Sequence, residues 1–195
     1  MNETYKVQVQ DLVDDLKAVF THAGLGGEAG EYKLLTQSFL YKFLNDKFLY
    51  QAKVLDESNT YENLLAMSED DYDWLLEDIG TSTAWLKPDQ LIETLHRQQN
   101  EATFYESFEN TLNQIAIDNN DIFSVHTDGD TAIRLFDERL ITDTISDSSK
   151  RNEVAKAIIN LLARVKFDET IFSQGFDFFS TLFEYMIKDY NKDGG

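Results

Sequence analysis

Cysteine is absent from this chain of 195 residues. A protein without cysteine forms no disulfide, no thiolate metal site and no cysteine nucleophile, so these classes of site are excluded. The amino-terminal stretch MNETYKVQVQDLVDDL is polar and acidic, where a secretory signal would be basic and then apolar. We therefore expect a cytoplasmic protein in a reducing compartment.

Proline and glycine are also scarce, with 1 Pro and 9 Gly in the whole chain. Multi-stranded sheets need many turns, whereas long helices joined by short loops need few. No apolar run approaches the ~18 residues that a membrane span requires, so no membrane contact is expected. The hydrophobic content of 42% is enough to bury a core. These features predict one compact, mostly all-α domain over residues 1–195.

Positively charged residues are also few. The chain has 17 Lys and Arg and 36 Asp and Glu, which gives a net charge of −19. Such a body repels DNA phosphates, so the chain alone should not bind DNA tightly. A local basic strip could still contact DNA or a partner. Its candidates are three cation pairs: Lys42 with Lys47, Lys150 with Arg151, and Arg164 with Lys166. Solubilising surface charge remains an equally good interpretation of these residues.

Apolar residues recur at helical spacing through most of the chain. The pattern predicts helices over residues 7–20, 31–55, 60–68, 69–80, 88–98, 104–117, 151–167 and 176–190, with a shorter one over 134–140. In the second helix Phe39 and Phe43 fall one turn apart, so we expect a central helix with both rings in the core. The segment VHTDGDTAI (125–133) is either a short hairpin or a loop.

Capping residues support these boundaries. Ser58, Asn59 and Thr60 supply an N-cap for the helix over 60–68, Ser68 with Asp71 resembles a capping box, and Gly80 ends the helix that follows. Carboxylates such as Glu69 in that first turn are explained by the helix dipole and need no catalytic role.

The sequence contains no catalytic motif in the structural context that the motif requires. GLGGEA (24–29) fits a dinucleotide fingerprint in spacing but joins two predicted helices, so we interpret it as an interhelical turn. The three histidines are scattered, with no two of them one helical turn apart, and no nucleophile elbow or Walker loop is present. DYNKDGG (189–195) matches the start of a calcium loop, but the ligand at loop position 12 would be residue 200. A helix end is the preferred interpretation.

Three segments, in order, resemble a known family. GEYKLLTQSFLYKFLNDKF (30–48) resembles the second-helix signature of modification subunits of type I restriction-modification systems, where Glu-Tyr-Lys precedes a Phe-Leu-Lys-Tyr-Leu-Ser-Asp-like run. KRNEVAKAIINLLARVKFDE (150–169) is similar to the family's Arg-Asn helix. GFDFFSTLFEYMIKDYNKDGG (175–195) is similar to the segment with Tyr-Glu-Tyr-Leu, whose places are taken here by Phe183, Glu184, Tyr185 and Met186.

The resemblance implies the helical N-terminal domain of an adenine-specific DNA methyltransferase that uses S-adenosylmethionine. Its implied partners are the specificity and restriction subunits of the same system, and DNA in the assembled complex. The family's Asn-Pro-Pro-Phe or Tyr motif needs adjacent prolines, and Pro88 is the sole proline. We therefore expect no catalytic, cofactor or metal residue here, with the catalytic domain following residue 195.

Within that interpretation, Lys42, Lys47, Lys150 and Arg151 are the candidate contacts to DNA or a partner. The alternative is a stand-alone acidic interaction protein, or a DNA mimic that presents carboxylates like phosphates. A mimic needs an ordered carboxylate stripe, whereas the acidic residues here are spread over every segment and interleaved with lysine.

Overall fold

The computed structural model describes residues 3–81, 83–120, 135–167 and 170–173. Every regular element in these ranges is a helix, which confirms the predicted all-α class. The predicted hairpin or loop over 125–133, the helix predicted over 176–190 and the calcium-like pattern over 189–195 all lie outside the described residues.

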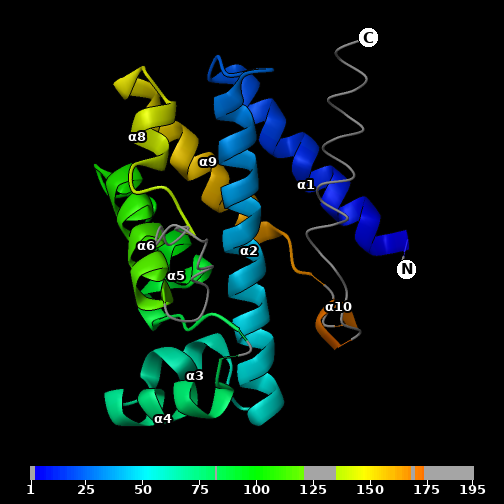
Figure 1. Ribbon diagram of the computed structural model, residues 1–195, viewed down its shortest axis with the longest axis vertical. Helices are drawn as coiled ribbons and strands as arrows, with labels where there is room; N and C mark the ends of the chain where they lie inside the picture. Colours follow the sequence, from blue (N-terminus) through cyan, green and yellow to red (C-terminus); the bar gives the residue numbers. More distant parts are fainter. Residues whose placement is uncertain (1–2, 82, 121–134, 168–169, 174–195) are drawn as a thin grey trace, which may run out of the picture.

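A single long helix organises the fold. The elements are α1 (Glu3–His22), α2 (Ala29–Leu55), α3 (Tyr61–Ala66), α4 (Glu69–Ile79), a 3-10 turn (Pro88–Gln90), α5 (Ile92–Gln98), α6 (Phe104–Asp118), α8 (Leu140–Thr144), a second 3-10 turn (Ser148–Lys150), α9 (Arg151–Arg164) and α10 (Thr170–Ser173). In Figure 1, α2 runs along the long axis through the centre of the molecule.

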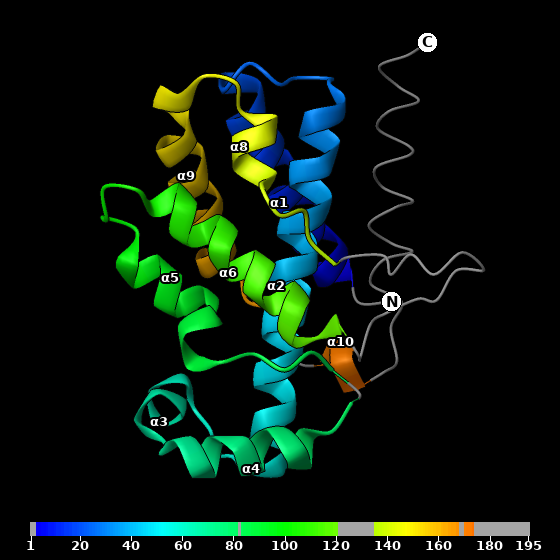
Figure 2. The same cartoon turned by 60° about the vertical axis from the view of Figure 1, so that its left-hand side comes forward.

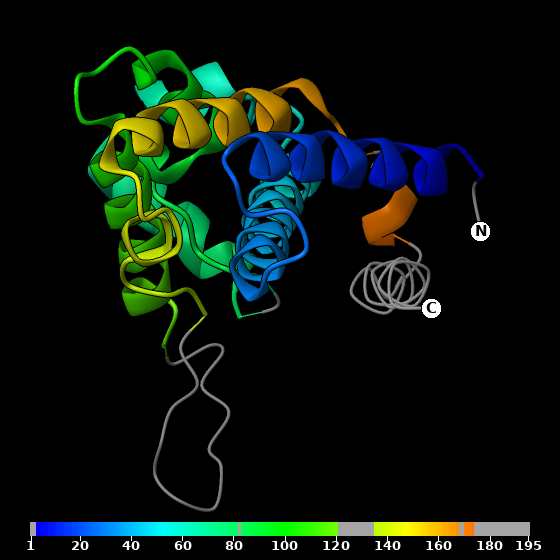
Figure 3. The ribbon, with the colours of Figure 1, turned by 90° about the horizontal axis from the view of Figure 1, so that it is seen from above.

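The other helices surround α2. Seen from above, α1 and α9 lie side by side across one flank of the molecule (Figure 3). Helices α5 and α6 also pack against α9, α8 packs against α2, and α3 and α4 lie at the end of the molecule where α2 finishes (Figure 2). The core therefore lies around α2, as its broad apolar face predicts.

Burial along α2 confirms one of the two predicted core rings and corrects the other. Phe39 is fully buried, whereas Phe43 is half-buried at the edge of the core. The ring of Phe43 lies 5.8 Å from the ring of Phe172 in α10. Polar groups of α2 also reach inward, because Tyr41 Oη donates to the carbonyl of Gln90 at 2.7 Å. Burial raises the pKa of Tyr41, so its hydroxyl remains a donor.

The predicted caps are present. Thr60 Oγ1 accepts a hydrogen bond from Asn63 N, and Ser68 Oγ accepts one from Asp71 N at 3.2 Å. The Asp71 carboxylate in turn accepts from the Ser68 hydroxyl at 2.6 Å. Gly80 ends α4 with φ 68°, a conformation that side-chain-bearing residues rarely adopt. Local sequence therefore fixes α4 firmly at both ends.

Two helix predictions were wrong. The helix predicted over 88–98 is interrupted at Leu91, which is extended between the 3-10 turn and α5. The side chain of Gln90 explains the break, because its oxygen accepts from Lys87 N at 2.8 Å and its amide donates to Asp118 at 2.9 Å. This pairing holds the turn in place, so helical spacing alone could not reveal the interruption.

The short helix predicted over 134–140 begins only at Leu140. The preceding residues are held by Gln37 of α2, whose side-chain oxygen accepts from Asp137 N at 2.9 Å. The amide of Gln37 also donates to the Asp137 carboxylate at 2.9 Å. Contact with α2 therefore replaces the intrahelical hydrogen bonds that the spacing predicted.

Candidate functional site

A cavity of about 510 Å³ opens beside the carboxyl-terminal half of α2. We call it the α2 groove. Its walls come from α2, α3, α5, the residues after α9, and α10, and its charged and aromatic lining residues are Lys42, Asp46, Tyr50, Lys53, Tyr61, Glu62, Glu93, Arg97, Lys166, Phe167 and Phe172. The cations among them gather locally on a chain whose net charge is −19.

One wall of the α2 groove is a buried ion pair. Lys42 and Asp46 are neighbours one helical turn apart on α2, and Lys42 Nζ lies 2.9 Å from Asp46 Oδ2. Their side chains are only 4% and 13% exposed. Asp46 also accepts from Asn45 Nδ2 at 2.9 Å and from Phe167 N at 3.5 Å. The carboxylate thus joins α2 to the residues that follow α9.

Burial changes the acid–base behaviour of this lysine. Desolvation lowers the pKa of Lys42, and the nearby carboxylate of Asp46 partly offsets that effect. The ammonium also lies 5.6 Å from the centre of the Phe167 ring, a favourable cation–π position. Lys42 is therefore committed to internal contacts.

The facing wall is an exposed network around Arg97 of α5. Its guanidinium lies 2.6 Å from Glu62 Oε1 and 3.3 Å from Glu93 Oε1. It also stacks 4.7 Å from the centre of the Tyr61 ring. The hydroxyl of Tyr61 is 2.9 Å from Thr94 Oγ1, which fixes the ring. This wall links α3 to α5.

The α2 groove has the size and the lining of a binding site. Aromatic rings and paired charges can hold a partner's side chains, and the volume lies within the ~300–1,000 Å³ range of ligand sites. Among the described residues no cluster of His, Asp and Glu is arranged to hold a metal ion. The chemistry that the groove offers is reversible recognition by charge and stacking.

The structure does not unite the predicted basic residues into one strip. Lys42 is 3% exposed, and this burial leaves it without the exposure that a DNA contact needs. Lys47 is half-buried, and its ammonium lies 5.8 Å from the centre of the Phe43 ring. Desolvation lowers the pKa of Lys47. Lys42 and Lys47 are thus held against aromatic rings of the fold.

Lys150 and Arg151, the second predicted pair, make different contacts. Arg151 donates to the carbonyls of Ile145 at 3.0 Å and Thr142 at 3.2 Å, so it secures the approach to α9. Its guanidinium also lies 5.9 Å from the centre of the Tyr105 ring. Lys150 instead lines a second cavity of about 430 Å³ between α1 and α9. Both residues are half-buried, but Lys150 lines a cavity whereas Arg151 is engaged with backbone carbonyls.

Arg164 and Lys166, the third predicted pair, also make different contacts. Arg164 forms an ion pair with Asp15 of α1, whereas Lys166 is exposed and lines the α2 groove. Our sequence reasoning missed Lys53, Arg97 and Tyr61. The spacing of Glu93 and Arg97 gave a local signal of a helical ion pair, but no spacing indicates that α3 and α5 meet beside α2.

Residues behind the family resemblance serve the fold. Glu31 is 4% exposed, and its carboxylate accepts from Gly27 N at 2.7 Å, which closes the turn between α1 and α2. Gly27 has φ 76°, as expected of the interhelical turn predicted for GLGGEA. Asn152 accepts from Tyr105 N at 3.0 Å and donates to the carbonyl of Ala102, so it caps α6.

Comparisons with protein-family models, curated proteins and solved structures found no match to this chain. None of the helices in the described ranges has both the length and the apolar character that crossing a bilayer takes.

Proposed function

We propose that this chain is the N-terminal assembly domain of a DNA adenine methyltransferase subunit from a type I restriction-modification system. In this role the helices position an S-adenosylmethionine-dependent catalytic domain and a specificity subunit on DNA. The chain itself supplies contacts, and the methyl transfer takes place in the catalytic domain.

The main support for this proposal is that residues in the family-like segments make contacts that stabilise the fold. Glu31, Arg151 and Asn152 lie in two of the three segments that resemble the family. Glu31 closes the turn before α2, and Arg151 and Asn152 join the start of α9 to α8 and α6. This structural role supports the proposal, because substituting such residues would leave buried polar groups unpaired and disturb helix packing. The family-like segment 30–48 also falls mainly on α2, the helix around which the others are arranged.

Charge distribution supports a contact role within a larger complex. At net charge −19 the domain alone is repelled by phosphates, but a tethered catalytic domain would hold it beside DNA at high effective concentration. Weak local contacts through a lysine that borders a cavity then become significant. Lys150 is the predicted residue whose position suits this role, since Arg151 is engaged with backbone carbonyls.

A charge reversal in the assembled complex tests this assignment. Lys150→Glu should weaken DNA binding about equally across sequences and reduce the slope of log affinity against log salt by about 1, without changing the recognised site. Binding would be measured by fluorescence anisotropy over a salt series. Arg139→Glu is the matched control, because Arg139 is 63% exposed and lines neither cavity. Equal losses in both variants would refute a contact by Lys150.

A further inference from the structure

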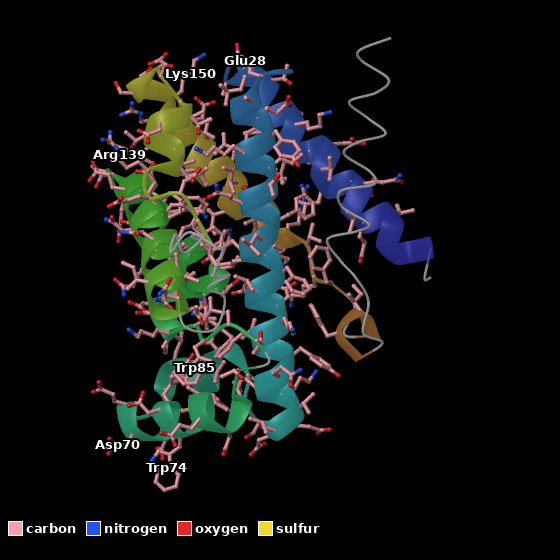
Figure 4. All side chains as sticks on the ribbon, in the orientation of Figure 1. Glu28, Asp70, Trp74, Trp85, Arg139 and Lys150 are labelled. Atoms are coloured by element: carbon pink, nitrogen blue, oxygen red, sulfur yellow. The ribbon has the colours of Figure 1, made fainter. Side chains whose placement is uncertain are left out.

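The most exposed aromatic residue in the described ranges lies on α4, at the end of the molecule away from Lys150 and Glu28. Trp74 is 74% exposed, and Figure 4 shows its ring projecting away from the body of the protein. A tryptophan side chain is large and apolar, so leaving it in water forgoes a considerable gain in stability. Trp85 shows the usual alternative, because it is half-buried and donates to the carbonyl of Gly80 at 2.7 Å.

Carboxylates surround this indole. Helix geometry places Asp70 and Asp71 one turn before Trp74, and Glu77 and Asp78 one turn after it. All four residues are exposed. Asp71 accepts from Ser68, and within the described part of the chain no ion pair neutralises Asp70, Glu77 or Asp78. An aromatic face is therefore surrounded by negative charge.

Two of these four acids oppose the dipole of the helix that carries them. Asp70 and Asp71 lie in the first turn, where the helix dipole favours negative charge. Glu77 and Asp78 lie in the last turn, where the dipole disfavours it, and that turn holds no basic residue. Glu77 and Asp78 therefore lower the stability of α4 and contribute nothing to its packing. Residues of this kind indicate a role in binding another molecule.

The helix is also rigidly mounted. Tyr72, Leu75, Leu76 and Ile79 form its buried face. Tyr72 Oη donates to the carbonyl of Leu86 at 2.6 Å, and burial raises the pKa of this hydroxyl, which keeps its proton. With both ends capped, α4 presents Trp74 in a fixed direction, so little order has to be gained on binding.

We propose that α4 is a docking face for a basic protein segment. An arginine or lysine of that segment stacks on the indole of Trp74, and flanking cations pair with Asp70, Glu77 and Asp78. A cation over an indole is the strongest of the aromatic cation–π contacts, and the surrounding carboxylates strengthen the local attraction.

Other occupants fit this face poorly. A second copy of the chain would bring carboxylates against carboxylates, at net charge −19 on each molecule. Nucleic acids and anionic membranes would be repelled for the same reason. A purely apolar partner would bury the carboxylates without providing counter-charges. A basic segment satisfies both the ring and the charges, and this surface is separate from the α2 groove.

The probe is an amidated, alanine-based helical peptide that carries arginines three and four residues apart, with a fluorescent label. Its affinity for the 195-residue chain would be measured by fluorescence anisotropy at physiological salt. Trp74→Ala and the triple variant Asp70→Asn, Glu77→Gln, Asp78→Asn should each weaken binding about tenfold. Trp85→Phe, which leaves Trp74 as the sole tryptophan, should leave binding unchanged, and the fluorescence of Trp74 should change on saturation.

General attraction to an acidic protein needs a matched control. The triple variant Asp11→Asn, Glu28→Gln, Glu153→Gln removes the same charge from exposed residues on α1, α9 and the turn before α2. If this variant weakens binding as much as the α4 variants, or if Trp74→Ala binds normally, the proposal is wrong. A concentration-dependent dimer in sedimentation experiments that Trp74→Ala dissociates would also overturn it in favour of self-association.

Discussion

Replacing Asp46 by alanine should lower the free energy of unfolding by about 3–5 kcal/mol, because it leaves the buried ammonium of Lys42 without its counter-charge. The side chain of Lys42 is only 4% exposed, so water cannot replace the lost carboxylate without local opening. Asn45 Nδ2 and Phe167 N lose their acceptor at the same time. Chemical denaturation monitored by circular dichroism would measure the loss.

The pH dependence of this variant gives an independent check. Burial lowers the pKa of Lys42 below the ordinary lysine value of 10.5, and removing Asp46 should lower it further. Between the pKa of Lys42 in the folded variant and 10.5, the unfolded variant binds more protons than the folded one. The free energy of unfolding of the variant therefore rises with pH in this window. The destabilisation of Asp46→Ala should therefore shrink as the pH increases toward 10.5 and be greatest below the lowered pKa.

A double substitution distinguishes the cost of an unpaired buried charge from the cost of lost packing. Lys42→Met together with Asp46→Leu removes both charges and retains apolar volume, so its stability should lie much closer to that of the unaltered chain. A small, pH-independent loss for Asp46→Ala would show that Lys42 is hydrated in solution. It would then be free to act as a surface cation.

Phe39→Ala should also cost about 3–5 kcal/mol, because Phe39 is fully buried on the central helix and truncation leaves a cavity. Phe43→Ala is the matched comparison on the same helix, one turn away. It should cost less than half as much, since Phe43 is half-buried and borders solvent. Denaturation midpoints at unchanged m-value would measure both changes. Equal losses would contradict the burial of Phe39 and the partial exposure of Phe43.

Periodicity and capping chemistry predicted most of the described helices, since each depends on residues within one or two turns. Thr60, Ser68 and Gly80 mark real helix ends because their hydrogen bonds and backbone angles are local. The extended residue at Leu91 and the late start of α8 could not be predicted this way. They depend on the side chains of Gln90 and Gln37, which reach partners distant in sequence.

The candidate site was harder to predict than the fold. Lys42 and Asp46 have the spacing of an ordinary exposed ion pair, and only the packing of Phe167 against α2 buries them. The wall formed by Tyr61 and Arg97 depends on how α3 and α5 meet, which no local pattern encodes. No feature of the sequence around Trp74 distinguishes it from the other aromatic residues, and only its exposure in the structure singles it out.

We propose that this chain is the assembly domain of a DNA adenine methyltransferase subunit. The most direct measurement is sequencing for N6-methyladenine in host DNA after in-frame deletion of residues 3–167 from the chromosomal gene. The proposal predicts that methylation disappears at one specific DNA sequence and returns when the intact gene is supplied. An unchanged methylation pattern would contradict it, and inhibition of unrelated nucleases by the isolated chain would favour the DNA mimic instead.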